Sequence, residues 1–138
     1  MFLYKKILVL MDCSSVDSVI VEHIKKLAKI HKSQVHFFHV VHVHTLDQQR
    51  IAIEETKNCL AKAKFTLKKA GLEASSSFAE GEPAEEILKK INETNWDLIA
   101  MATHGHKGLS DFISGSISNV IKHNIDKPIL LIKGKIKK

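Results

Sequence analysis

The sequence lacks any apolar run that is long enough to cross a lipid bilayer, so we expect no membrane-spanning helix. An apolar stretch does follow the basic pair near the N-terminus, but it covers only residues 7–11 and meets Asp12 at once. Because no small-residue cleavage site comes after it, this stretch predicts a buried strand and not a signal peptide. We expect no association with a membrane.

Cysteine is also scarce. Cys13 and Cys59 are the only two, they show no CxxC spacing, and no histidine lies at the distance that zinc fingers use. This pattern predicts two free thiols in a reducing compartment and a cytoplasmic location. A redox-sensing role for Cys13 is one interpretation, but with no resolving cysteine nearby we favour a small buried residue.

Aromatic residues are few as well: six phenylalanines, one tryptophan and one tyrosine, mostly in apolar runs. The formal net charge of +6 comes mostly from lysines that are spread along the predicted helices and over the last six residues. A nucleic-acid interface would interleave basic and aromatic residues or carry a recognisable motif. We therefore interpret the lysines as a solvated surface and expect no nucleic-acid partner.

Length and composition indicate one globular domain over residues 1–138. A chain of 138 residues with 44% hydrophobic and 26% charged residues buries a core without disulfides or structural metal. No internal repeat, linker or low-complexity segment divides it.

Apolar runs and helical periodicity alternate along the whole chain. Short runs rich in apolar and β-branched residues predict five strands, at residues 7–11, 35–43, 72–79, 97–101 and 128–132. Helical spacing predicts four helices between them, the first with an apolar stripe that includes Val19, Ile20 and Ile24. The serine-rich third strand is expected at an edge. This alternation predicts an α/β fold: an open five-stranded parallel sheet with helices on both faces, in a Rossmann-like three-layer arrangement.

Such a sheet binds its ligand beyond the carboxyl ends of the strands, where the strand order reverses. Asp12 follows the first predicted strand, Val40 lies toward the end of the second, and residues 101–116 follow the fourth. The Asp12 carboxylate is suited to accept a hydrogen bond from a ribose hydroxyl.

The segment after the fourth strand is rich in glycine and leads into a predicted helix. Gly115 and Ser116 lie where free amide groups and the positive end of the helix dipole favour phosphate. Ser118 adds a hydroxyl, and Lys107 or His106 a positive charge. The alternative is that glycines 105, 108 and 115 only shape the loop and the helix start; the spacing leaves both interpretations open.

At these segments the sequence resembles the universal stress protein family, over essentially the whole chain. The resemblance is carried by residues 5–14, 81–84, 97–105 and 127–132. The nucleotide-binding subgroup of that family has a glycine, two residues, a glycine, nine residues, and then glycine with serine or threonine. Ala102, Gly105, Gly115 and Ser116 follow this spacing here. The resemblance implies the fold of the adenine nucleotide alpha hydrolases.

The resemblance also implies a set of site residues. Leu10, Met11, Asp12 and Val40 would line the adenine and ribose pocket. Ribose and phosphates would be surrounded by Met101, Ala102, Gly105, Gly115, Ser116, Ile117 and Ser118, with His106 and Lys107 in the same loop. The implied ligand is ATP or another adenine nucleotide, with Mg²⁺ bridging its phosphates and no protein carboxylate assigned to that ion. The implied partner is a second copy, paired through residues 128–132 as an antiparallel continuation of the sheet.

This chain departs from the family pattern at three positions. Ala102 replaces the first glycine of the spacing, Leu10 replaces the proline common before the loop aspartate, and Cys13 replaces the glycine common after it. Alanine fits position 102 where φ is negative and is strained where φ is positive.

Four histidines, His36, His39, His42 and His44, lie in or beside the second predicted strand. A metal pair at His42 and His44 is one interpretation, because alternate strand residues share a face. No third or fourth ligand stands at a matching spacing, so we favour histidines of the strand and its rim.

The sequence predicts a nucleotide-binding regulatory module with at most slow ATP hydrolysis, and the resemblance implies a role in the stress response. It does not predict a dedicated enzyme, because no base is positioned to activate water. The alternative is a dimeric stress protein that binds no nucleotide and acts through protein partners.

Overall fold

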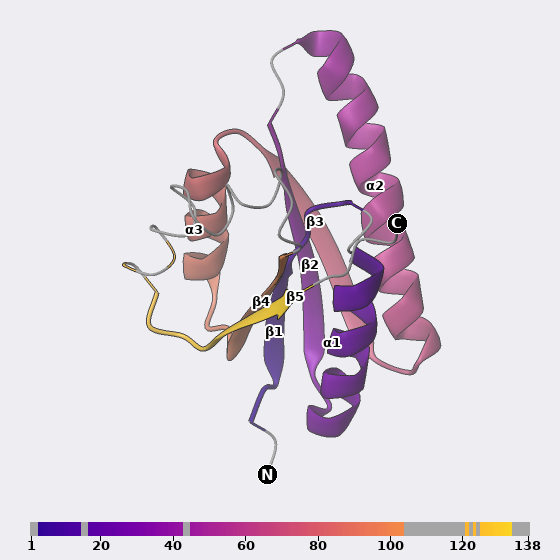
Figure 1. Cartoon of the computed structure of the whole chain (residues 1–138), viewed down its shortest axis with the longest axis vertical. Helices are drawn as coiled ribbons and strands as arrows, with labels where there is room; N and C mark the ends of the chain where they lie inside the picture. The colour runs from indigo at the N-terminus through magenta and orange to yellow at the C-terminus, as the bar shows by residue number, and fades with distance from the viewer. Residues whose placement is uncertain are drawn as a thin grey trace.

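A computed structural model describes residues 3–14, 17–42, 45–103, 121, 123 and 125–133 of the chain (Figure 1). The strands are β1 (Lys6–Leu10), β2 (Gln34–Val41), β3 (Glu73–Glu80), β4 (Leu98–Thr103) and β5 (Ile129–Lys133). The helices are α1 (Asp17–His31), α2 (Leu46–Lys69) and α3 (Pro83–Glu93). Most of the predicted fourth helix lies outside the described residues; Ile121 and His123 are helical.

The strands form one five-stranded sheet in the order β3-β2-β1-β4-β5, and every neighbouring pair is parallel. The predicted sheet is thus confirmed, with β3 at an edge. Successive strands move outward from β1 to β3, after which the chain returns to the other side of β1 with β4. The strand order therefore reverses between β1 and β4.

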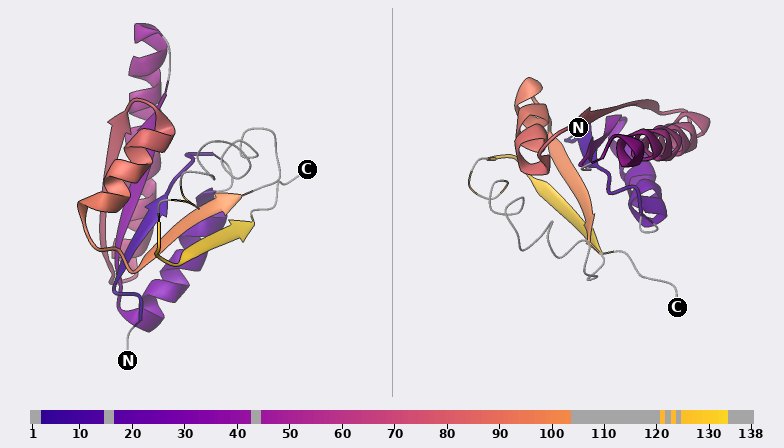
Figure 2. Two further views of the ribbon diagram at one scale, coloured as in Figure 1. Left: turned by 90° about the vertical axis from the view of Figure 1, so that its left-hand side faces the viewer. Right: turned by 90° about the horizontal axis from the view of Figure 1, so that it is seen from above.

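Helices cover both faces of the sheet, which confirms the three-layer arrangement. Seen from above, α1 and α2 lie on one side of the strands and α3 on the other (Figure 2). Alternate β1 side chains serve the two faces: Ile7 and Val9 pack with α1 and α2, and Leu8 and Leu10 pack with α3. All four are buried. A strand covered on both sides must be apolar throughout, which explains its continuous apolar run.

Two details of the predicted elements differ. Val19 was expected on the buried stripe of α1, but 37% of it is exposed and Val21 is buried instead. Asp97 was expected to begin the fourth strand, and it lies just before β4. Its Oδ2 accepts hydrogen bonds from the backbone N–H groups of Lys5 and Lys6 at 3.0 and 2.9 Å, which joins the amino ends of β1 and β4.

The helices also bear on the membrane prediction. Within the described residues, no helix combines the length and the apolar character that a bilayer crossing requires. Even α2, with 24 residues, buries only one stripe, made of Thr56, Leu60, Ala63 and Leu67.

His36 connects β2 to the edge strand β3 through its ring. Its Nδ1 and Nε2 atoms lie 2.7 and 2.8 Å from the hydroxyl oxygens of Ser75 and Ser77. A neutral imidazole fits this pair, since one nitrogen donates and the other accepts. Burial, and then the positive charge of Lys90, lower the pKa of His36 to about 4.

Acidification is expected to weaken the fold through this ring. The unfolded chain binds a proton at His36 with an ordinary pKa of 6.5, whereas the folded protein resists it down to about 4. Stability supplied by the neutral ring is therefore lost as the pH falls through this window. Asparagine cannot titrate in this range. Between these pH values, the free energy of unfolding of His36→Asn should therefore fall by about 1 kcal/mol less than that of the wild type, a figure reduced to allow for the exposed part of the ring.

Urea unfolding at a series of pH values measures this difference. His23→Asn is the matched control, because His23 lies exposed on α1. Parallel pH profiles for the wild type and His36→Asn would contradict the assignment.

Candidate functional site

The reversal of strand order brings two predicted segments of the site together. Leu10 at the end of β1 is in register with Met101 of β4, and Ala102 continues β4 beside Ile132. Met11 and Asp12 therefore leave the sheet beside the carboxyl end of β4. The carboxyl ends of the strands are where an open parallel sheet holds its ligand.

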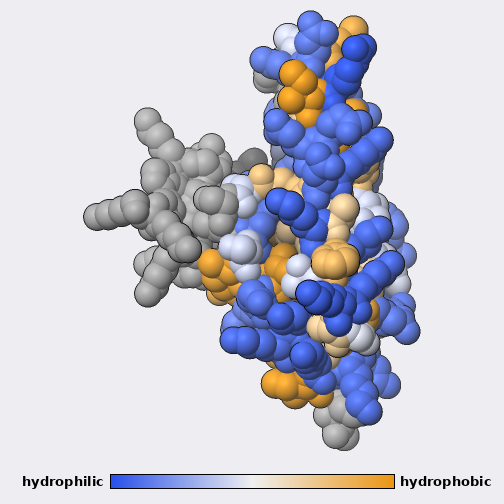
Figure 3. Space-filling view, turned by 90° about the vertical axis from the view of Figure 1, so that its right-hand side faces the viewer, coloured by the Kyte–Doolittle hydropathy of each residue, from blue (hydrophilic) through white to orange (hydrophobic). Residues whose placement is uncertain are grey.

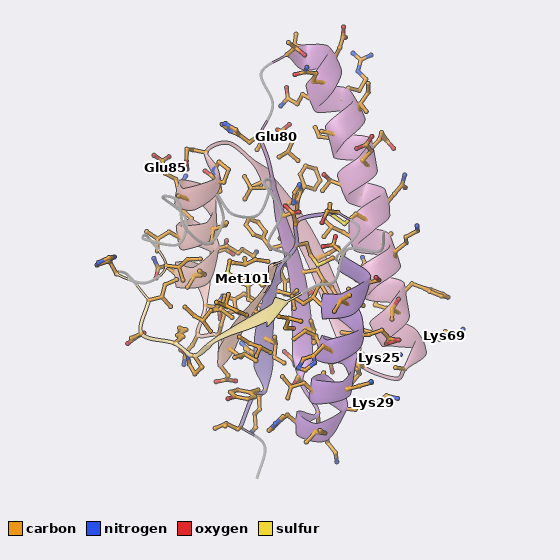
Figure 4. The ribbon with its side chains drawn as sticks, in the orientation of Figure 1. Lys25, Lys29, Lys69, Glu80, Glu85 and Met101 are labelled. Atoms are coloured by element: carbon orange, nitrogen blue, oxygen red, sulfur yellow. A yellow bond between two sulfur atoms is a disulfide. The ribbon has the colours of Figure 1, made fainter. Side chains whose placement is uncertain are left out.

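The predicted residues at this edge differ in exposure. The side chains of Leu10, Met11 and Met101 are at most 4% exposed. Leu10 and Met101 pack in the core on the α3 side, with Val40 against it, and Met11 packs in the core on the α1 and α2 side. Figure 4 labels Met101, which lies on β4 beside the end of β1. These three side chains are therefore part of the core beneath the carboxyl ends of the strands. Asp12, in contrast, is partly exposed.

His39 fixes the backbone of this loop and was not among the predicted site residues. Its Nδ1–H donates to the carbonyl oxygen of Met11 at 2.8 Å, and the Met11 N–H donates to the carbonyl oxygen of Phe38 at 2.7 Å. The two bonds extend the pairing of β1 with β2 just before Asp12. The histidine-rich pattern marked this residue, but its partner follows only from the register of the strands.

The remaining predicted site residues lie outside the described residues. They are Gly105, His106, Lys107, Gly115, Ser116, Ile117 and Ser118. Ala102 is described in its backbone pairing alone.

The prediction of free thiols is wrong. Cys13 and Cys59 form a disulfide with 5.8 Å between their Cα atoms, and neither cysteine is free (Figure 4). The two are 46 residues apart in sequence, and they meet because α2 packs beside α1 against the loop after β1. Cys13 has φ of 55°, a left-handed conformation that glycine adopts without strain.

Asp17 lies directly against this disulfide. Its Oδ2 is 3.4 Å from the Sγ atom of Cys59. Burial, and then the negative charge of Asp12, raise the pKa of Asp17 to about 7, while the backbone N–H groups of the loop oppose the shift. Oδ1 of Asp17 and Oγ of Ser14 are buried with no hydrogen-bond partner within the described part of the chain.

A cavity of about 550 Å³ opens beside the disulfide, between the loop after β1, α1 and α2. Its walls include Cys13, Asp17, Cys59, Lys62 and Met11. The surface that α1 and α2 present around it is mainly hydrophilic, with separate apolar groups (Figure 3).

The histidines described in β2 and just after it have local partners. His36 bonds Ser75 and Ser77, His39 bonds the Met11 carbonyl, and His42 Nδ1 lies 2.9 Å from the Gly81 carbonyl oxygen. His44 lies outside the described residues, so the pairing of His42 with His44 stays untested. The described histidines act in the sheet and its rim, as favoured above.

The fold defines a Rossmann-like α/β protein whose strand order reverses between β1 and β4. A profile of the Universal stress protein family matches residues 3–133, and the chain belongs to that family. Universal stress protein MJ0577 of Methanocaldococcus jannaschii is 27% identical, over 96% of this chain and 97% of its own length. A solved structure of MJ0577 superposes with a TM-score of 0.78 and 26% identity, covering 99% of each chain.

Two further solved structures share the fold and contain nucleotides. A universal stress protein in complex with cAMP has a TM-score of 0.72 and 15% identity, covering 94% of this chain and 97% of its own. The universal stress protein of Archaeoglobus fulgidus in complex with dAMP has a TM-score of 0.70 and 21% identity, covering 96% of this chain and 100% of its own.

Replacing Asp17 with asparagine is expected to stabilise the protein near neutral pH. The folded carboxyl keeps its proton up to pH about 7, whereas the unfolded carboxyl loses it near 3.8. The contribution of the protonated carboxyl is therefore lost as the pH rises through this window, the reverse of the His36 effect. Asparagine keeps the neutral form at every pH.

The stability of Asp17→Asn relative to the wild type should grow by about 2 kcal/mol between pH 4 and 7, less than full burial would give. Urea unfolding of both oxidised proteins across this range tests it. A difference that stays constant with pH would contradict the raised pKa of Asp17.

Proposed function

We propose that this universal stress protein binds an adenine nucleotide, ATP in particular, in the crevice beyond the carboxyl ends of β1 and β4. It would act as a nucleotide-dependent regulatory module of the stress response. The observation that carries the proposal is the pairing of β1 with β4 at the point of strand reversal, with Asp12 on the loop that leaves β1. A cytoplasmic location stays a prediction, although its argument from free thiols no longer holds.

The comparisons support the class of ligand. Two proteins of this fold were solved with cAMP and with dAMP, and both ligands are adenine nucleotides. At sequence identities of 15% and 21%, these structures establish only the shared fold. The proposal of a ligand for this chain is therefore argued from its own residues. The glycine spacing noted in the sequence adds a phosphate site at Gly115 and Ser116.

In the proposed complex, Asp12 accepts a hydrogen bond from a ribose hydroxyl. His39 supports this role, because its bond to the Met11 carbonyl holds the backbone next to Asp12. Ala102, Gly105, Gly115, Ser116 and Ser118 surround the ribose and phosphates, and Mg²⁺ accompanies the phosphates. The buried side chains of Leu10, Met11 and Met101 form the floor of the adenine end.

The residues near the proposed crevice suit a regulatory role better than the catalysis of ATP hydrolysis. A hydrolase needs a base that holds the attacking water, together with fixed charge at the phosphates. Asp12 is assigned to the sugar, and Asp17 is buried against the disulfide. At most slow hydrolysis is expected.

The proposal also includes a homodimer formed through β5. This strand lies at an edge of the sheet, and its Leu131 side chain is 51% exposed. An exposed apolar edge strand readily pairs with another strand. A second copy adding its own β5 would cover both edges at once.

Calorimetric titration of the purified protein with ATP and Mg²⁺ tests the nucleotide. We expect micromolar affinity, and about tenfold weaker binding for Asp12→Asn, because a charged acceptor for the sugar is lost. ATP analogues that lack either ribose hydroxyl give a thermodynamic cycle. The analogue missing the contacted hydroxyl should bind the wild type less tightly than ATP, but Asp12→Asn equally well.

Asp126→Asn is the control. Asp126 is exposed and precedes the amino end of β5, at the opposite end of the strands from the proposed crevice. No heat with millimolar ATP, and no nucleotide released on denaturation, would contradict nucleotide binding. That outcome would favour a stress protein that acts through protein partners.

The dimer is tested by Leu131→Lys. Burying an unpaired ammonium between two copies of β5 should weaken association by about 2 kcal/mol, roughly thirtyfold, and leave the monomer folded. Sedimentation equilibrium measures the change. Ile30→Lys is the control, because Ile30 is 67% exposed and lies on α1, outside the β5 strand. Equal association of the wild type and Leu131→Lys would contradict the β5 interface.

A further inference from the structure

We propose that the Cys13–Cys59 disulfide is a redox-active pair that exchanges with a small thiol or dithiol, and that Asp17 donates the proton to the departing Cys59 sulfur. This inference concerns the face of the sheet covered by α1 and α2. It does not depend on nucleotide binding.

Three elements bring the reacting groups together. Cys13 comes from the loop after β1, Asp17 from the first turn of α1, and Cys59 from the middle of α2. The Asp17 Oδ2 atom lies 3.4 Å from the Cys59 Sγ atom, and the buried Oδ1 atom has no hydrogen-bond partner within the described residues. A carboxyl placed in this way contacts the sulfur that changes its protonation on reduction.

The pair is also accessible. Cys13 and Cys59 are both partly exposed, and both line the cavity of about 550 Å³ between the loop, α1 and α2. A small thiol of a few heavy atoms fits a space of that volume. A disulfide that served stability alone would need neither an open cavity nor a buried carboxyl beside it.

The exchange balances as a two-electron reduction. A reductant thiolate attacks Cys13 Sγ, the bond between the two protein sulfurs breaks, and Cys59 Sγ leaves with the electron pair. Asp17 gives its proton to that sulfur and becomes a carboxylate. A second reductant thiolate then displaces Cys13, which takes a proton from solvent and leaves two protein thiols and an oxidised reductant. Oxidation runs the same steps in reverse, with Asp17 taking the proton of the Cys59 thiol.

Of the charged groups around the cavity, Asp12 acts on this proton. Asp12 in the loop disfavours the Asp17 carboxylate, and Glu22 of α1 and Lys62 of α2 line the same cavity with opposite charges. Burial raises the pKa of Asp17 to about 7, so the carboxyl is mostly protonated below pH 6 and about half protonated at pH 7. Above that pH its negative charge disfavours the Cys59 thiolate as a leaving group.

The test follows the reduction of the full-length oxidised protein by dithiothreitol, with the thiols counted by maleimide labelling and mass spectrometry. Each rate is divided by the concentration of reductant thiolate. For the wild type, this corrected rate should be constant below pH 6 and fall as the pH passes 7. Asp17→Asn should be about tenfold slower below pH 6 and show no change near pH 7.

Glu22→Gln is the matched control, since it neutralises another acidic wall residue of the cavity and should keep the wild-type profile. Reoxidation in air or with oxidised glutathione should restore the disulfide in the folded protein. A disulfide that resists dithiothreitol until urea unfolds the protein would overturn the proposal. The same corrected profile for the wild type and Asp17→Asn would overturn the role of Asp17.

Discussion

The pairing of β1 with β2 on one side and β4 on the other is the constraint on which the rest of the molecule depends. Because β1 is central and buried on both faces, its residues must alternate between two apolar cores. The same pairing sets which loops leave the sheet together. It places Met11 and Asp12 beside the end of β4, and it turns the following loop toward α1 and α2.

The polar groups of the protein are satisfied unevenly. Asp97 accepts two backbone hydrogen bonds, and His36 bonds two serines. In contrast, Cys13 in the loop after β1 is left-handed, and the buried Ser14 Oγ of this loop and Asp17 Oδ1 at the start of α1 have no hydrogen-bond partner within the described residues. Local features that cost stability concentrate where a protein acts rather than where it folds. Both the proposed nucleotide crevice and the proposed redox pair use this loop.

The fold could be predicted from the sequence because strands and helices are marked by local patterns of apolar residues. Continuous apolar runs mark strands covered on both faces, as in residues 7–11, and the spacing of Thr56, Leu60, Ala63 and Leu67 marks the buried face of α2. Val19 was misplaced because Val21 and Val19 both fit an apolar stripe, and only packing against the sheet decides between them.

The site was less predictable, since its contacts join distant segments. Cys13 and Cys59 have no spacing motif, and their 46-residue separation gives no sign that α2 brings them together. The bond from His39 to Met11 depends on the exact register of β2 with β1. An acidic residue in the first turn of a helix, as Asp17 is in α1, is a common local feature, but its burial against a sulfur is a tertiary effect.

The central claim is that the crevice between β1 and β4 holds the ligand of this protein. Mapping amide chemical shifts by NMR while ATP and Mg²⁺ are added tests it most directly. We predict that, within the described residues, the largest changes fall on residues 10–13, 39–41 and 101–103. Changes confined to the cavity between α1 and α2, or no changes at saturating ATP, would contradict the claim.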